Sequence, residues 1–176
     1  HPRWGERRMN QTMTPIDWAK RPIVEKYADF SGRAPRAEYW WYALAIGIAA
    51  IVLSIVESLV GLRGMVFGVY GPLTVLLWLG TIVPGIAVSV RRLHDTNRSG
   101  WWLLLMVPYL LVAIMTAMAL AGGGLAALGV AGLLGIVGLV CAIVLLVFMV
   151  LPSTPGENRY GPNPYGAAGD TAIAAE

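Results

Sequence analysis

Four apolar runs, each long enough to cross a lipid bilayer as a helix, constrain this chain more than any other feature of its sequence. They cover residues 39–59, 72–90, 101–120 and 125–151. A hydrocarbon core of about 30 Å needs about 20 helical residues to cross it. Of the ten acidic and thirteen basic residues, all except Glu57 lie outside these runs. A soluble helical bundle would need a polar stripe along each helix, so the runs predict transmembrane helices.

The basic residues outside the runs are distributed asymmetrically. Twelve of the thirteen precede the first run, separate the second from the third or follow the fourth, and only Arg63 lies in an alternate loop. Short cytoplasmic loops carry excess Lys and Arg. We therefore expect an all-α integral membrane protein, a four-helix bundle with four transmembrane helices and both termini in the cytoplasm. Its membrane domain is expected over residues 32–164, between an N-terminal extension (1–13), either disordered or derived from cloning, and a flexible tail (165–176).

The segment before the first run predicts a short amphipathic helix at the membrane surface, over residues 14–31. The stretch TPID at residues 14–17 fits a capping box, with Pro15 at the first helical position. Pro22 is expected to break or kink the helix. Its apolar side chains would face lipid while its basic side chains face headgroups, and packing against another part of the protein explains the pattern equally well.

The runs themselves contain few polar or structure-breaking residues. Glu57, near the end of the first run, is expected to extend its side chain to the outer surface, with a buried proton or ion site as the alternative. Pro84 and Pro108 predict kinks in the second and third helices. Glycines recur every three residues in the fourth run, at positions 129, 132, 135 and 138. They predict a tight helix-packing face, within the bundle or against a second copy of the chain.

The loop between the second and third runs holds a dense cluster of polar and aromatic residues, VRRLHDTNRSGWW at residues 90–102. Arginines suit the end of a helix, Ser99 can cap the next one, and tryptophans anchor helices at the membrane interface. The expected interface anchors are Trp40, Trp41, Trp101 and Trp102.

A histidine beside a carboxylate, His94 and Asp95, raises the question of acid–base catalysis or metal binding. Adjacent helical side chains point in different directions, and His1 is the only other histidine in the chain. We therefore assign no catalytic residue, no metal and no cofactor. Asp95 is expected to pair with nearby arginines, and His94 to form hydrogen bonds in the loop.

Arginines from three separate segments are predicted to meet on the cytoplasmic face. Guanidinium groups bind phosphate in a bidentate fashion, and basic pockets between helices at this level bind anionic lipid headgroups. Positive-inside bias alone also accounts for many of these residues. The candidate ligand- or headgroup-binding residues are Arg33, Arg36, Arg91, Arg92, His94, Asp95, Arg98, Asn158, Arg159 and Tyr160. A net charge of only +3 argues against a nucleic-acid partner.

Three predicted cytoplasmic segments, FSGRAPRAEYWW, PGIAVSVRRLHDTNRSGWW and LPSTPGENRYGPNP, occur in this order between the apolar spans. Through them the chain resembles the domain of unknown function family 805, small bacterial inner-membrane proteins, over roughly Phe30 to Pro164. The resemblance implies a bacterial inner-membrane location and topology but no established activity. We expect the three segments to fold into a polar cap, in which Asp95 holds arginines and Asn158 and Tyr160 complete hydrogen bonds.

These observations favour a non-enzymatic inner-membrane protein whose basic cytoplasmic cap binds anionic lipid headgroups or a protein partner. A small oligomeric transporter or channel component is the alternative, and a membrane enzyme acting on a lipid phosphate is third. Membrane lipids are the expected partners, and the glycine-rich fourth run is compatible with a homo-oligomer.

Overall fold

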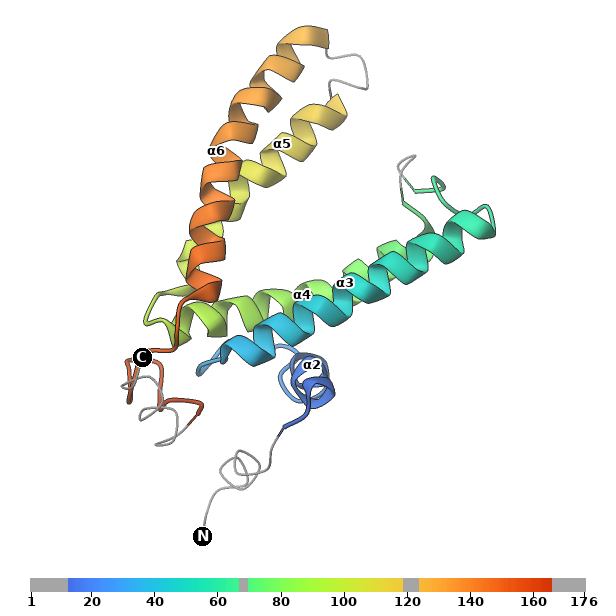
Figure 1. The fold of residues 1–176 in the computed structure, drawn as a ribbon. Coiled ribbons are helices and arrows are strands. Elements are labelled where there is room, and N and C mark those ends of the chain that lie inside the picture. The colour runs from blue at the N-terminus through green and yellow to red at the C-terminus, as the bar shows by residue number, and fades with distance from the viewer. Residues whose placement is uncertain (1–12, 67–69, 119–123, 166–176) are drawn as a thin grey trace.

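A computed structural model describes residues 13–66, 70–118 and 124–165 of the chain. The described part is helical, as expected, and its only β-type pairings are two isolated bridges. The elements in chain order are α2 (Pro15–Val24), α3 (Arg36–Leu59), α4 (Pro72–Asp95), the 3₁₀ helix η1 (Gly100–Met106), α5 (Val107–Met118) and α6 (Gly124–Val150), as Figure 1 shows.

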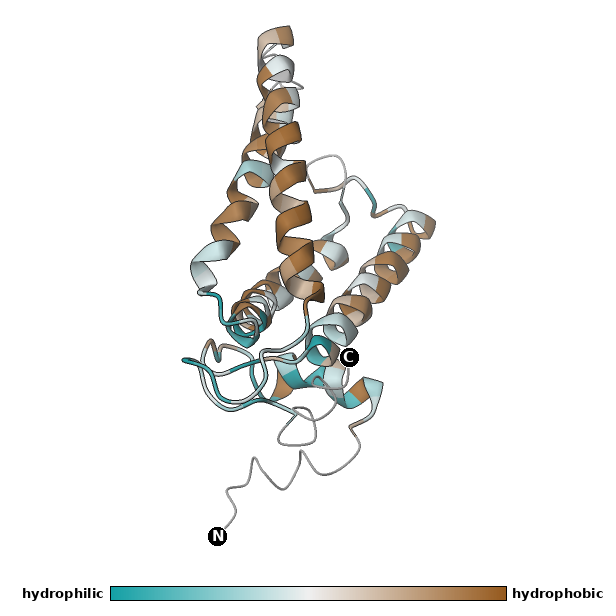
Figure 2. Ribbon diagram, turned by 60° about the vertical axis from the view of Figure 1, so that its left-hand side comes forward, coloured by the Kyte–Doolittle hydropathy of each residue, from teal (hydrophilic) through white to brown (hydrophobic). Residues whose placement is uncertain are grey.

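Among the described residues, three helices are long and apolar enough to cross a membrane: α3, α4 and α6. Figure 2 shows their predominantly hydrophobic composition. The third expected span is different, because it divides into η1 and the 12-residue α5. Pro108 explains the division, since a proline has no N–H and its ring clashes with the carbonyl four residues earlier. The described residues thus contain three candidate spans where the sequence predicted four.

The helices pack as two hairpins, α3 with α4 and the shorter α5 with α6. The hairpins meet at one end and diverge from it, so the described helices do not form the closed four-helix bundle that we expected (Figure 1). Polar residues gather where the hairpins meet (Figure 2). We call this region the cap and define it as residues 31–36, 91–99 and 151–165.

Helix α2 packs against the hairpin of α3 and α4. The expected capping box is confirmed, because Thr14 and Asp17 bond to each other's backbone N–H. The helix includes Pro22 and ends two residues later, at Val24. Packing against the protein, one of the two explanations for the amphipathic pattern, is therefore observed. Ile16 and Val24 are nevertheless 63% and 75% exposed, which leaves apolar surface on α2 available to lipid.

Glu57 does not reach the outer surface as expected, because its residue is only 1% exposed. Its carboxylate accepts hydrogen bonds from the backbone N–H of Thr74 (2.9 Å) and from the Thr74 hydroxyl (2.7 Å). The N–H of Leu73 is a third donor. Glu57 therefore caps the amino terminus of α4, where the unpaired N–H groups and the helix dipole favour a negative charge. Any side chain at Gly71 would collide with this carboxylate.

The glycines of α6 differ in what they contact. A Cβ at Gly138 would lie 3.5 Å from the backbone nitrogen of Tyr109 in α5, whereas Gly129, Gly132 and Gly135 have open space at that position. Close packing inside the chain is therefore confirmed only at Gly138, which allows α6 to approach the backbone of α5.

Candidate functional site

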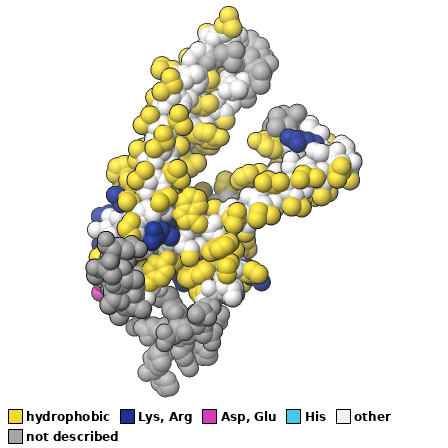
Figure 3. All heavy atoms as spheres, in the orientation of Figure 1, with side chains coloured by type: hydrophobic (Ala, Val, Ile, Leu, Met, Phe, Trp, Pro, Cys, Tyr) yellow, Lys and Arg dark blue, Asp and Glu magenta, His cyan; other side chains and the backbone are white. Residues whose placement is uncertain are grey.

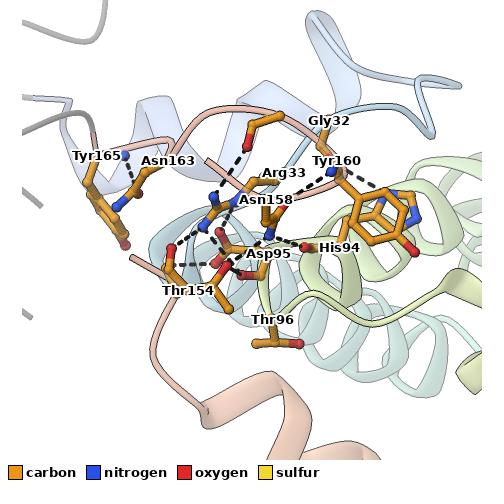
Figure 4. Close-up of polar contacts among 12 residues, drawn as sticks. Gly32, Arg33, His94, Asp95, Thr96, Thr154, Asn158, Tyr160, Asn163 and Tyr165 are labelled. Atoms are coloured by element: carbon orange, nitrogen blue, oxygen red, sulfur yellow. Dashed lines mark hydrogen bonds and ion pairs between the residues drawn. The ribbon is translucent and has the colours of Figure 1, made fainter. Parts of the chain in front are cut away.

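The cap joins three segments that are far apart in the sequence: the start of α3, the end of α4 and the chain after α6 (Figure 4). Backbone hydrogen bonds connect them directly. The N–H of Ala34 donates to the carbonyl of Arg91 (2.9 Å), and the N–H of Thr154 donates to the carbonyl of Asp95 (3.0 Å). The three predicted cytoplasmic segments thus fold together, as expected.

Asp95 is the central acceptor of the cap and is fully buried. Its carboxylate receives hydrogen bonds from Arg33 Nε (2.9 Å), from Arg92 Nη1 and from the Ser153 hydroxyl. Burying a carboxylate is unfavourable unless charge partners and hydrogen bonds replace water. The expected pairing of Asp95 with arginines is therefore confirmed, and it connects all three segments.

Arg33 uses its whole guanidinium group inside the cap. Nε donates to the Asp95 carboxylate, and Nη2 donates to the backbone carbonyls of Thr154 (2.6 Å) and Asp95 (3.4 Å). Nη1 donates to the carbonyls of Gly156 (2.8 Å) and Gly161 (3.4 Å). An arginine side chain has five N–H donors, so this network satisfies all of them. Arg33 therefore fastens the start of α3 to the chain that follows α6.

Arg92 binds the carboxyl end of α6. Its Nε donates to the carbonyl of Met149 (3.1 Å) and its Nη2 to the carbonyl of Leu151. The last carbonyls of a helix have no partner within the helix and carry the negative end of its dipole. Arg33 and Arg92 share one carboxylate, and these carbonyls help to compensate the remaining positive charge.

A second buried carboxylate, Glu38, lies in the first turn of α3 and links the cap to α2. It accepts hydrogen bonds from Arg91 (2.5 Å) and from Arg21 of α2 (2.9 Å). Glu38 is fully buried and Arg91 is 1% exposed. Arg91 Nε and Nη2 have no hydrogen-bond partner among the described residues. Glu38 was absent from the predicted site, although an acid next to an apolar span is a recognisable signal of a paired charge.

His94 and Asn158 complete the side of the cap shown in Figure 4. The rings of His94 and Tyr160 are stacked, with centroids 3.7 Å apart. His94 Nδ1 lies 3.2 Å from the carbonyl of Gly32, so this nitrogen donates a proton, because a carbonyl can only accept one. The Asn158 amide donates to the carbonyl of His94 (2.9 Å), and Asn158 Oδ1 accepts from the N–H of Tyr160 (2.9 Å).

The remaining candidate arginines lie at the edge of the cap, and we call Arg36, Arg98 and Arg159 the rim. Arg36 and Arg159 are exposed and Arg98 is partly exposed. The guanidinium of Arg159 lies 4.7 Å from the centroid of the Tyr160 ring, and that of Arg98 lies 4.1 Å from the Phe148 ring. Ser99 precedes η1 but makes no capping hydrogen bond with its side chain, contrary to the expected cap.

The expected interface anchors are all exposed and lie near the cap. The exposed fractions are 39% for Trp40, 38% for Trp41, 77% for Trp101 and 43% for Trp102. Figure 3 shows basic side chains beside hydrophobic ones at this end of the molecule. The four indole rings and the rim arginines therefore lie at the same end of the molecule.

The contacts of His94 and Asp95 also limit the chemistry of the site. The His94 ring binds the Gly32 carbonyl, whereas the Asp95 carboxylate binds two arginines and a serine. The two side chains therefore do not form a histidine–carboxylate dyad. Over the described ranges, no group of three or more His, Cys, Asp or Glu residues is placed to hold a metal ion.

Three membrane-length apolar helices and a buried polar cap at their shared end define an integral membrane protein. The chain belongs to the family of proteins of unknown function DUF805, whose model matches residues 27–162. It is 33% identical over 150 residues to inner membrane protein YhaH of Escherichia coli strain K12, covering 85% of this chain and 97% of that protein. It is 38% identical over 89 residues to inner membrane protein YhaI of the same strain, covering 50% and 70% of the two chains. No solved structure matches the chain.

Proposed function

We propose that this chain is a non-enzymatic, four-crossing inner-membrane protein whose cap fixes the helix ends on the cytoplasmic side and whose rim arginines bind anionic lipid headgroups. The observation that carries this proposal is the division of the arginines into two sets. Arg33, Arg91 and Arg92 are buried and paired inside the cap, while the rim is accessible. The headgroup-binding role expected of all six cap arginines is therefore narrowed to Arg36, Arg98 and Arg159.

The positions of the helix ends support four crossings. Helix α4 ends at the cap, and so does α6, since Arg92 binds the carbonyls at its end. Helix α6 must then begin at the opposite membrane face if it crosses the bilayer. The connection from α4 to α6 starts at the cap, so η1 and α5 together have to cross as well. The extended geometry of a 3₁₀ helix, about 2.0 Å per residue, helps this shorter segment to do so.

The charge distribution and the relatives support the location and orientation. Two related proteins of Escherichia coli are named as inner membrane proteins. All basic residues other than Arg63 lie on the cap side of the expected spans, and basic residues favour retention in the cytoplasm. A cytoplasmic cap would also place the rim beside the inner leaflet, where anionic lipids attract basic residues.

The proposal is tested by measuring lipid preference with the full chain purified in detergent. Native mass spectrometry would compare binding of phosphatidylglycerol and phosphatidylcholine with identical acyl chains. Each basic residue near an anionic surface contributes about 1 kcal/mol. The double variant Arg36→Gln/Arg159→Gln should therefore reduce the preference for phosphatidylglycerol by roughly 30-fold, because about 1.4 kcal/mol corresponds to a tenfold change.

Arg63→Gln is the matched control, because it removes one exposed arginine at the opposite end of α3. It should change the preference less than about twofold, since a distant exposed charge is screened. A wild-type chain that binds both lipids equally, or a rim variant that keeps the full preference, would contradict the proposed function.

A further inference from the structure

One open groove, with a volume of about 310 Å³, lies near Glu57, and a larger one lies beside the cap. The larger groove, of about 470 Å³, runs between α4 and η1. One wall is a single face of α4, because its residues Ile86, Val90 and His94 are spaced four apart. The opposite wall comes from η1 and includes Trp101 and Leu104.

The groove changes from polar to apolar along its length. His94 and Tyr160 line it at the cap, and Ile86 lines it further along α4. Eight helical residues separate His94 from Ile86, which corresponds to about 12 Å along the helix axis. Trp101 and Leu104 on the other wall are 77% and 58% exposed. A molecule in the groove would therefore have one end beside the cap and an apolar part along α4.

The local geometry of η1 explains why the two walls can lie so close at the cap. Gly100, the first residue of η1, lies against Val90 of α4. A Cβ at Gly100 would be only 3.0 Å from Val90 Cγ1, so the Val90 side chain would have to shift to accommodate it. Beyond this contact, the larger side chains of Leu103 and Leu104 line the groove.

At the cap end, an exposed cation lies next to a residue that lines the groove. Arg159 lies over the Tyr160 ring, which is itself stacked on His94. His94 Nδ1 donates to the Gly32 carbonyl, so His94 closes the cap end of the groove and leaves the contact with an anion to Arg159. The stacked pair therefore holds the Arg159 guanidinium over Tyr160, next to the cap end of the groove.

We propose that this groove binds one phospholipid with an anionic headgroup: an acyl chain lies along Ile86 and Leu104, and the phosphate lies at the cap end against Arg159. The inference rests on the proposed headgroup role of the rim and assigns that role to one place. The positive charge of Arg159 favours an anionic headgroup, and the apolar walls beside the expected interfacial tryptophans favour an acyl chain. The volume falls in the range of about 300–1,000 Å³ that is usual for small-molecule sites.

The first experiment fills the groove. Ile86→Trp and Leu104→Trp each add a bulky ring to a wall residue that is 46% or 58% exposed, so the ring has space to turn into the groove. Ile48→Trp is the control, because Ile48 is 53% exposed on α3 and lines neither groove. Native mass spectrometry of the delipidated full chain, titrated with phosphatidylglycerol, should give a Kd at least tenfold higher for both groove variants and an unchanged Kd for the control.

A second measurement uses the unchanged protein, so it does not depend on how a variant folds. Phosphatidylglycerol that carries a photoreactive diazirine in its acyl chain should crosslink mainly to residues 86–104. Crosslinks distributed evenly over α3, α4 and α6 would overturn the groove site, as would groove variants that bind phosphatidylglycerol like the wild type.

The outcomes separate the two proposals. If Arg159→Gln weakens the preference for phosphatidylglycerol about fivefold while both groove variants bind normally, the headgroup role stands and the groove site is wrong. If the wild type shows no preference for phosphatidylglycerol, but both groove variants lose phosphatidylcholine binding, an acyl-chain groove remains and the headgroup role fails.

Discussion

Replacing Asp95 by asparagine tests the organisation of the cap most directly. Asparagine has nearly the same shape and can still accept the hydrogen bond from Ser153, but it carries no charge. The change leaves Arg33 and Arg92, which are 1% and 0% exposed in their side chains, without their shared carboxylate. Neither guanidinium can recover its hydration without opening the cap.

The expected loss is large for a single substitution. Breaking a buried ion pair by removing one partner costs about 3–5 kcal/mol, because the other charge remains buried and uncompensated. For a chain of this size, each 1 kcal/mol lowers the melting temperature by about 2–4 °C. Asp95→Asn should therefore lower the melting temperature of the detergent-solubilised protein by roughly 6–20 °C, as followed by intrinsic tryptophan fluorescence.

Glu157→Gln is the matched control, since it removes an exposed carboxylate from the same cap. Exposed substitutions of this kind usually change stability by no more than about 0.5 kcal/mol. The double variant Arg33→Met/Asp95→Asn should be less destabilised than the sum of its single variants, by about 0.5–3 kcal/mol, because the partners act on each other. An Asp95→Asn protein that melts within about 2 °C of the wild type would refute the central role of this carboxylate.

The remaining predictions concern other parts of the chain. Glu57→Gln should speed amide hydrogen exchange at the start of α4. Thr74→Val should speed it less, because Thr74 supplies only some of the hydrogen bonds to the Glu57 carboxylate. Equal exchange rates in the wild type and both variants would exclude the capping role. Hydrogen bonds from the Thr14 hydroxyl and then the Thr14 N–H lower the pKa of Asp17 below 3.8. The capping box should therefore stabilise α2 fully above pH 3.8, and this stabilisation should be lost as the pH falls through the lower pKa of Asp17 in the folded protein. Amide exchange rates in α2, measured as a function of pH, would test this. Asp17→Asn should remove the pH dependence. In a Cys141→Ala background, Arg63→Cys and Glu157→Cys should react with a membrane-impermeant maleimide from opposite compartments, and labelling of both from one side would contradict the four-crossing topology.

The features that were predictable from the sequence depend on residues that are close together along the chain. The capping box of α2 is a pattern of four consecutive residues, and the apolar lengths of α3, α4 and α6 can be counted directly. Pro108 indicated a disturbance in the third span, but propensity did not distinguish a kinked α-helix from the 3₁₀ geometry that forms there. Local rules also could not indicate that the two hairpins diverge.

The interactions that sequence analysis missed join residues far apart in the chain. Glu38 pairs with arginines 17 and 53 residues away, so its partners depend on how α2 and α4 pack. We expected Glu57 to reach water because its position near the end of the first apolar run places it close to the membrane surface. Its actual partners lie in the next helix, which bends back at Gly71 and presents free N–H groups to the carboxylate.

The dependence of the cap on acceptors beyond residue 148 has a consequence for biogenesis. Arg33 and Arg92 find their carbonyl partners at Met149, Leu151, Thr154 and the glycines that follow. These residues emerge from the ribosome only after α3 and α4 have been synthesised. The basic end of the first hairpin must therefore stay hydrated until residues 149–161 have been translated, and these residues then close the cap.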